Sequence, residues 1–186
     1  GLNTEQRAVR TRRQAQVENW DNRASTMAGE IKQSAVPLIL KAVQKEIDDF
    51  NKELNNIPEI LKEENRKKAE EINKDVKTLM DIKETLTKLQ AMDNADVART
   101  LALAPQVGSL LRVSMARPDI SQQITSNTWE LIKKVDDVAK ATNASLQYQQ
   151  KLMEYMLNPQ ALNKDMEEAD KEAVSEYIKK QTEQIK

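Results

Sequence analysis

The side chains best suited to chemistry in this sequence are carboxylates, which gather in two clusters. The first comprises Glu63, Glu64, Glu70 and Glu71, and the second comprises Asp165, Glu167, Glu168 and Asp170. An Mg²⁺ or Ca²⁺ site made only of oxygen ligands would need such side chains to converge. Lysines interleave with both clusters and compete for the carboxylates, and neither spacing matches a calcium-binding loop. We therefore interpret both clusters as solvated helix faces and predict no metal site.

Most catalytic arrangements are excluded by residue types that the chain lacks. The sequence contains no histidine and no cysteine, which removes the usual general base near neutral pH, the Ser-His and Cys-His nucleophiles, and every thiolate or imidazole metal site. Gly29 and Gly108 are the only internal glycines, so the glycine-rich loops that bind nucleotide phosphates are missing too. We predict no enzyme activity, no catalytic residues and no cofactor.

Four arginines crowd the first turns of the chain and are candidate contacts for an anion such as a phosphate: Arg7, Arg10, Arg12 and Arg13. The net charge is only −1 and aromatic residues make up 3 % of the sequence. Both values disfavour nucleic-acid binding, which needs a continuous basic surface. Trp20 follows this cluster. We predict that its side chain is a core anchor and not part of an exposed contact site.

The elements that must position any site are long helices. From Val36 to Leu61 the apolar residues recur at alternating three- and four-residue intervals, which is a heptad seam that needs a partner surface: Val36, Leu40, Val43, Ile47, Phe50, Leu54, Ile57 and Leu61. Charged residues reach 32 %, and the chain has only three glycines and five prolines. This composition predicts an all-α fold, an elongated antiparallel bundle of five or six helices with coiled-coil-like seams.

We predict one domain, residues 1–186, with helices at about 4–35, 38–55, 58–92, 96–117, 119–157 and 160–185. Pro37 should end or kink the first helix. Around Asn55 and Pro58 a break and a kink that keeps the heptad phase are both open. The seam of the 119–157 helix turns polar at Thr142, Ser145 and Gln149, which predicts either a buried polar layer or a local shift of the face towards Leu146 and Met153. We favour the shift.

The 96–117 segment is the least charged part of the chain and is apolar on more than one face. It should be either the most buried helix or a docking surface for a partner. Residues 152–157 form a second, smaller apolar patch. The candidate partner-binding residues are Leu103, Val107, Leu110, Leu111, Met153, Tyr155 and Met156.

Short motifs lie in order along the middle of the chain: Ala104-Pro105-Gln106-Val107, then Trp129, then Thr142-Asn143-Ala144-Ser145-Leu146. With them, residues 89–152 resemble the toxic-anion (tellurite) resistance family of helical bacterial proteins, in its Pro-Gln step, tryptophan and Thr-Asn-x-x-Leu helix. The Trp129–Thr142 spacing is shorter than in the family, and the N-terminal half has no counterpart there. The resemblance implies a cytoplasmic, non-enzymatic, stress-related protein and assigns no site residue.

The function that these observations favour is a non-enzymatic structural or interaction protein. It would be a helical scaffold or adaptor, such as a component of a bacterial or phage assembly, that binds a protein partner or self-associates through helical seams. Besides the family resemblance, nucleic-acid binding and a membrane-acting role of residues 97–115 stay open. No run of residues has the length of a membrane span. A cytoplasmic location is expected, but the chain begins at Gly1 without Met, which leaves a secreted or periplasmic location after signal removal open.

Overall fold

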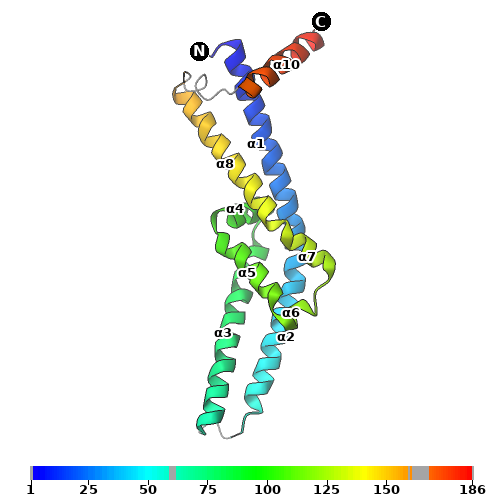
Figure 1. Cartoon of the computed structure of the whole chain (residues 1–186), viewed down its shortest axis with the longest axis vertical. Coiled ribbons are helices and arrows are strands. Elements are labelled where there is room, and N and C mark those ends of the chain that lie inside the picture. Colours follow the sequence, from blue (N-terminus) through cyan, green and yellow to red (C-terminus); the bar gives the residue numbers. More distant parts are fainter. Residues whose placement is uncertain (1, 59–61, 159, 161–167, 186) are drawn as a thin grey trace. The chain divides into compact units, whose positions relative to one another are not determined.

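Helices make up nearly all of the computed structural model (Figure 1). It describes residues 2–58, 62–158, 160 and 168–185, and within these ranges it contains no strand. The predicted all-α class is therefore confirmed. Contacts group the residues into two compact units: residues 24–139 form one, and residues 1–23 with 140–186 form the other. Because two long helices contribute residues to both units, the single domain that we expected stays a prediction.

The larger unit begins with the end of α1 (Thr4–Glu30) and the π-helix η1 (Ile31–Ala35) and includes the start of α8 (Val135–Leu157). Between them lie α2 (Val36–Asn55), α3 (Glu63–Ala91), α4 (Asn94–Leu103), α5 (Pro105–Ala116), α6 (Pro118–Ser121) and α7 (Ser126–Lys133). Helices α2 and α3 run side by side as an antiparallel hairpin (Figure 1), and α5 and α6 pack against α2. The largest fully buried side chains of this unit are Ile31, Val36, Ile39, Leu79, Leu86, Leu89, Leu111, Met115 and Ile120.

The α-helix is interrupted before Pro37, as we predicted, since α1 ends at Glu30 and α2 begins at Val36. The chain stays helical because the preceding turn widens into a π-helix, in which the Val36 N–H donates to the Ile31 carbonyl instead of the carbonyl four residues back. A proline inside a helix lacks a donor and crowds the carbonyl four residues before it. Single π-turns relieve such conflicts, so Pro37 takes a position in the first turn of α2.

The heptad seam of residues 36–61 is confirmed only in its first half. Val36, Val43 and Ile47 are buried, but α2 ends at Asn55 and α3 begins at Glu63. The break near Asn55 was therefore the correct alternative, and Ile57 lies outside any helix. Leu61 lies outside the described residues.

The long helix predicted for residues 119–157 is divided into α6, α7 and α8. Residues 121–128 explain the break between α6 and α7, because Ser, Thr and Asn side chains compete for backbone hydrogen bonds and favour helix ends over helix interiors. The Thr125 hydroxyl caps α7 by accepting a hydrogen bond from the Thr128 N–H at 3.4 Å. Hydrophobic spacing alone did not reveal this new start.

The smaller unit combines the first part of α1, the second part of α8, and α10 (Glu168–Ile185). Its core contains Ala8, Val9 and Tyr155, and the half-buried residues packed against them are Leu152, Tyr177 and Ile178. Trp20 is half-buried rather than a core anchor, and its ring lies 4.9 Å from that of Tyr148, centroid to centroid.

The polar seam of α8 is buried at Thr142 and Ser145 but exposed at Gln149, and the shift of the face towards Met153 that we favoured is wrong. Thr142 and Ser145 are buried, whereas Met153 is exposed. The Ser145 hydroxyl donates to the Asp21 carboxylate of α1 at 2.5 Å and accepts from the Gln149 amide at 3.0 Å. These hydrogen bonds satisfy the Ser145 hydroxyl, whereas the buried Thr142 hydroxyl has no hydrogen-bond partner among the described residues.

We predict that Gly108→Ala destabilises the protein by about 1–3 kcal/mol through overpacking. A Cβ at this position would lie 2.9 Å from a methyl group of Val135, which is buried and β-branched and therefore cannot yield easily. The strain should exceed the gain in helix propensity of about 1 kcal/mol. Urea unfolding measures the difference.

The matched background for this prediction is Val135→Ala, which removes the opposing methyl group. In that background Gly108→Ala should be neutral or stabilising, because only the propensity gain remains. Equal destabilisation in both backgrounds would show that the close approach of α5 to α8 does not determine the cost.

Candidate partner-binding face

Helices α4 and α5 form a bent pair whose geometry follows from local sequence. The Asp93 carboxylate caps α4 by accepting a hydrogen bond from the Asp96 N–H at 2.8 Å. Ala104 leaves helical geometry, with φ −123° and ψ 75°, because it precedes Pro105. Pro105 then opens α5, where its missing N–H is no loss. The bend places Leu103 at the end of one helix, just before the other begins.

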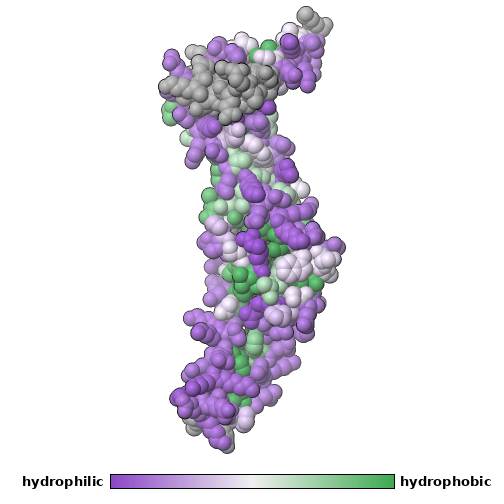
Figure 2. Space-filling view, viewed as in Figure 1, coloured by the Kyte–Doolittle hydropathy of each residue, from purple (hydrophilic) through white to green (hydrophobic). Residues whose placement is uncertain are grey.

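One side of this pair is buried and the other exposes large apolar side chains. Leu101, Leu111 and Met115 are buried, whereas Leu103 and Val113 are 66 % and 63 % exposed. Val107 and Leu110 are half-buried between these extremes. We name the set Leu103, Val107, Leu110 and Val113 the α4–α5 face. Figure 2 shows apolar surface over α5, while the surface over α3 is mainly hydrophilic.

Three of the four residues of the α4–α5 face lie on a stretch without charge, and the fourth, Val113, follows Arg112 at the end of that stretch. No residue from Thr100 to Leu111 is ionisable, although 32 % of the chain is charged. Charged residues appear only at its two margins, and both arginines there are paired within the chain. Arg99 lies 3.1 Å from Asp96, and Arg112 lies 3.1 Å from Asp136 at the start of α8.

A buried ion pair fixes the end of α5 against α2. Arg117, between α5 and α6, donates to the Glu46 carboxylate from Nε at 3.1 and 3.2 Å and from Nη2 at 2.7 Å. The Glu46 side chain is only 5 % exposed. Its hydrogen bonds and charge raise the pKa of the Arg117 guanidinium above the ordinary value, against the opposing effect of burial. This bidentate geometry is the strong form of the Arg–carboxylate interaction.

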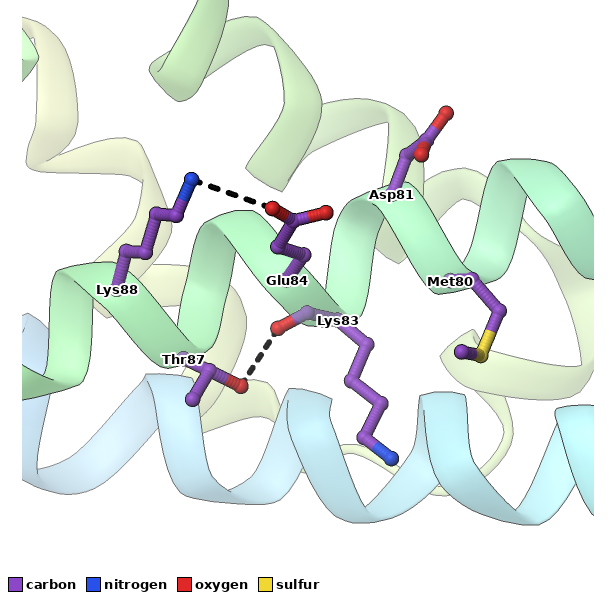
Figure 3. A pocket seen from close by; sticks show the side chains of 6 residues that line it. All are labelled: Met80, Asp81, Lys83, Glu84, Thr87 and Lys88. Atoms are coloured by element: carbon purple, nitrogen blue, oxygen red, sulfur yellow. Dashed lines mark hydrogen bonds and ion pairs between the residues drawn. The ribbon is translucent and has the colours of Figure 1, made fainter.

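A shallow hollow of about 380 Å³ lies beside the α4–α5 face. It is lined by Met92, Asp96, Arg99, Thr100, Leu103 and Ala104. A second hollow, of about 370 Å³, lies on α3 and is lined by Met80, Asp81, Lys83, Glu84, Thr87 and Lys88 (Figure 3). In the second hollow Lys88 pairs with Glu84 at 3.2 Å, and both side chains are largely exposed. A solvent-exposed ion pair of this kind lacks the desolvated setting of a catalytic group.

Of the seven predicted partner-binding residues, five are at least partly exposed in the structure and two are buried. Leu103, Val107 and Leu110 belong to the α4–α5 face, but Leu111 is fully buried because it lies one residue, or about 100°, further round the helix. Tyr155 is likewise buried, in the core of the smaller unit. Leu111 and Tyr155 therefore cannot line a surface. Our list omitted Val113, although its three-residue spacing from Leu110 was a usable signal.

Of the candidate residues in the patch predicted on α8, only Met153 and Met156 point outward. Met153 and Met156 are 65 % and 69 % exposed, on a turn whose opposite side carries the buried Tyr155. These methionines lie in the smaller unit, whereas the α4–α5 face belongs to the larger one. They are two separate candidate surfaces.

The predicted arginine cluster does not present four guanidinium groups to solvent. Arg13 is buried, with its guanidinium carbon 4.3 Å from the centroid of the Tyr148 ring, so an anion contact by Arg13 is not supported. Arg10 and Arg12 are half-buried, and the exposed Arg7 donates to the Leu2 carbonyl at 3.0 Å. Stacking on Tyr148 gives Arg13 a structural role through a cation–π contact.

The structure describes the side chains of the first carboxylate cluster, which lie exposed on α3 beside basic residues. Glu63 and Glu70 are exposed and lie 3.8 Å from Lys67 and 4.0 Å from Arg66, respectively. Among the described residues no group of three or more carboxylates is placed to hold a metal ion. The second cluster, residues 165–170, lies outside the side chains that the structure describes.

None of the helices in the described ranges combines the length and the apolar character that crossing a membrane requires. Comparisons with protein families, with curated proteins and with solved structures find no match for this chain. The resemblance to the toxic-anion resistance family therefore stays a prediction, and the candidate face must be judged on its own geometry.

We predict that Arg117→Met lowers the free energy of unfolding by about 3–5 kcal/mol, because it leaves the buried Glu46 carboxylate without its partner. The double variant Glu46→Leu/Arg117→Met should recover most of the loss, since an apolar pair of similar volume removes the buried charge. Urea denaturation of both variants measures the two values. Equal stability of the single and double variants would contradict the assigned role of the pair.

Proposed function

We propose that this chain is a non-enzymatic interaction protein, a helical scaffold that docks a protein partner on the α4–α5 face. One observation carries the proposal. Leu103 is about two-thirds exposed within the twelve-residue uncharged stretch from Thr100 to Leu111, and the equally exposed Val113 lies just beyond it, after Arg112, in a chain that is otherwise highly charged. Single exposed apolar residues are ordinary, but apolar residues grouped on an uncharged surface are typical of an interface core.

The energetics support docking at this face. Full burial of an exposed leucine or valine side chain contributes roughly 1.5–3 kcal/mol. Leu103 and Val113 would gain most of this on docking, and the half-buried Val107 and Leu110 only a part, which suits a modest complex. The backbone that carries them is already ordered by the Asp93 cap, the Ala104 bend and the Arg117–Glu46 pair. A partner would therefore not have to supply the ordering entropy of this surface.

The composition supports a role without catalysis. The chain has no histidine, no cysteine and no glycine-rich loop, and the two hollows described above are shallow and lined by exposed side chains. A binding face suits this chemistry better than a pocket, because apolar contact needs no activated group.

We predict that a photo-crosslinking side chain at position 113 captures a protein in cells that contain this sequence. A benzophenone amino acid at position 113 should give a discrete adduct after irradiation, because the exposed site would lie inside the interface. Denaturing electrophoresis with mass spectrometry identifies the adduct.

Position 70 is the matched control. Glu70 is exposed on the hydrophilic surface of α3, so the same side chain there should give no discrete adduct. If positions 113 and 70 give the same pattern, or if neither reacts, the α4–α5 face is not a docking surface.

A further inference from the structure

We propose that the partner on the α4–α5 face is a second copy of this chain, bound across a two-fold axis. The inference rests on the proposed function and specifies the occupant of the same face. In an isologous dimer the same patch serves both subunits, so the patch must be complementary to itself.

The first argument is electrostatic. Two identical surfaces bring like charges together, and a face with a net charge would therefore repel its copy. The stretch from Thr100 to Leu111 carries no charge. At its margins Arg99 and Arg112 are each 3.1 Å from an aspartate of the same chain. The face can thus meet itself without repulsion.

The second argument is that the arginines at both ends of the uncharged stretch are already paired within the chain, so they offer a charged foreign partner little electrostatic attraction. Charge pairs across an interface fix the choice of partner and its orientation. A charged partner here would have to compete with Asp96 for Arg99 and with Asp136 for Arg112. A neutral apolar surface leaves both pairs intact, and the α4–α5 face of another copy is such a surface.

The third argument concerns shape. The hollow of about 380 Å³ beside the face is lined in part by Leu103 and Ala104, while Val113 projects from α5. In a two-fold dimer any side chain of one copy that enters a hollow of the other is matched by the reciprocal contact. A side chain that fills this hollow would therefore make the same contact twice in the dimer.

The expected affinity is modest. Because the face has only four apolar residues, two of them already half-buried, the interface should lie at or below the lower end of the specific range, which is about 1,200 Å² in total. A dissociation constant in the range of about 1–100 μM follows from such a size when the core is apolar and preorganised. Association should therefore depend visibly on concentration.

The test is sedimentation equilibrium of the full chain over about 1–500 μM, a range that brackets the expected constant. The mass should rise from that of the 21.2 kDa monomer towards twice that value and not beyond it. Leu103→Glu and Val113→Glu should each weaken the dimer at least tenfold, since each places a charge against its copy. Both residues are largely exposed, so circular dichroism should show an unchanged fold.

Met80→Glu is the matched control, because Met80 is an apolar residue of α3 that is 48 % exposed and lies outside the face. It should leave the dimer unchanged. A second measurement uses the absence of cysteine: single spin labels on Val113→Cys and Met80→Cys report distances between copies. The dimer should give one intermolecular distance distribution at each position, shorter at 113 than at 80.

A monomer at every concentration would overturn the inference, as would a dimer that both face variants leave intact. The photo-crosslink at position 113 separates this failure from failure of the proposed function. An adduct of twice the chain mass supports self-pairing. An adduct with a different protein, together with a monomeric chain, rejects the second copy but keeps the docking face, and no adduct at all rejects both.

Discussion

The buried pair of Glu46 and Arg117 is the constraint on which the geometry of the larger unit depends. A carboxylate with so little exposure would destabilise the fold unless a charge and several hydrogen bonds compensated it. Arg117 provides both, with three hydrogen bonds of 2.7–3.2 Å. Because Arg117 stands between α5 and α6, satisfying Glu46 also fixes where α5 ends against α2. The orientation of the α4–α5 face follows, since Leu111 and Met115 must then point inward.

This pair also marks the limit of what the sequence could predict. Apolar spacing correctly indicated helices and the buried positions Val43 and Ile47. It gave no reason to bury Glu46, because the compensating arginine lies 71 residues further along the chain. Local rules correctly indicated an interruption of the α-helix at Pro37, but they did not predict its form, a single π-turn that keeps the chain helical. Spacing and propensity are local signals, whereas both outcomes depend on tertiary contacts.

The candidate face was predictable as a segment but not as a surface. Low charge identified residues 96–117, yet a helix that is apolar on more than one side has no unique inner face in its sequence. The structure separates neighbours such as Leu110 and Leu111, which point in directions about 100° apart. The arginine cluster shows the same limit, because Arg13 is withdrawn from solvent by Tyr148, 135 residues away. The residue types were enough to select the candidate residues. Whether each candidate is exposed depends on the side chains that pack against it, and these could not be read from the sequence.

Polar groups are used differently inside the helix packing and on the outward α4–α5 face, and this contrast bears on function. In the smaller unit, the buried Ser145 forms hydrogen bonds with the exposed Asp21 and Gln149 at the edge of the packing between α1 and α8, where polar groups restrict the registers in which helices can pair. On the α4–α5 face, charges are confined to the margins and neutralised within the chain. A surface of that kind provides no electrostatic steering, so its selectivity must come from shape and apolar contact. Internal packing is thus specified by polar contacts, while the outward face is left neutral, which is the arrangement that permits a surface to pair with itself.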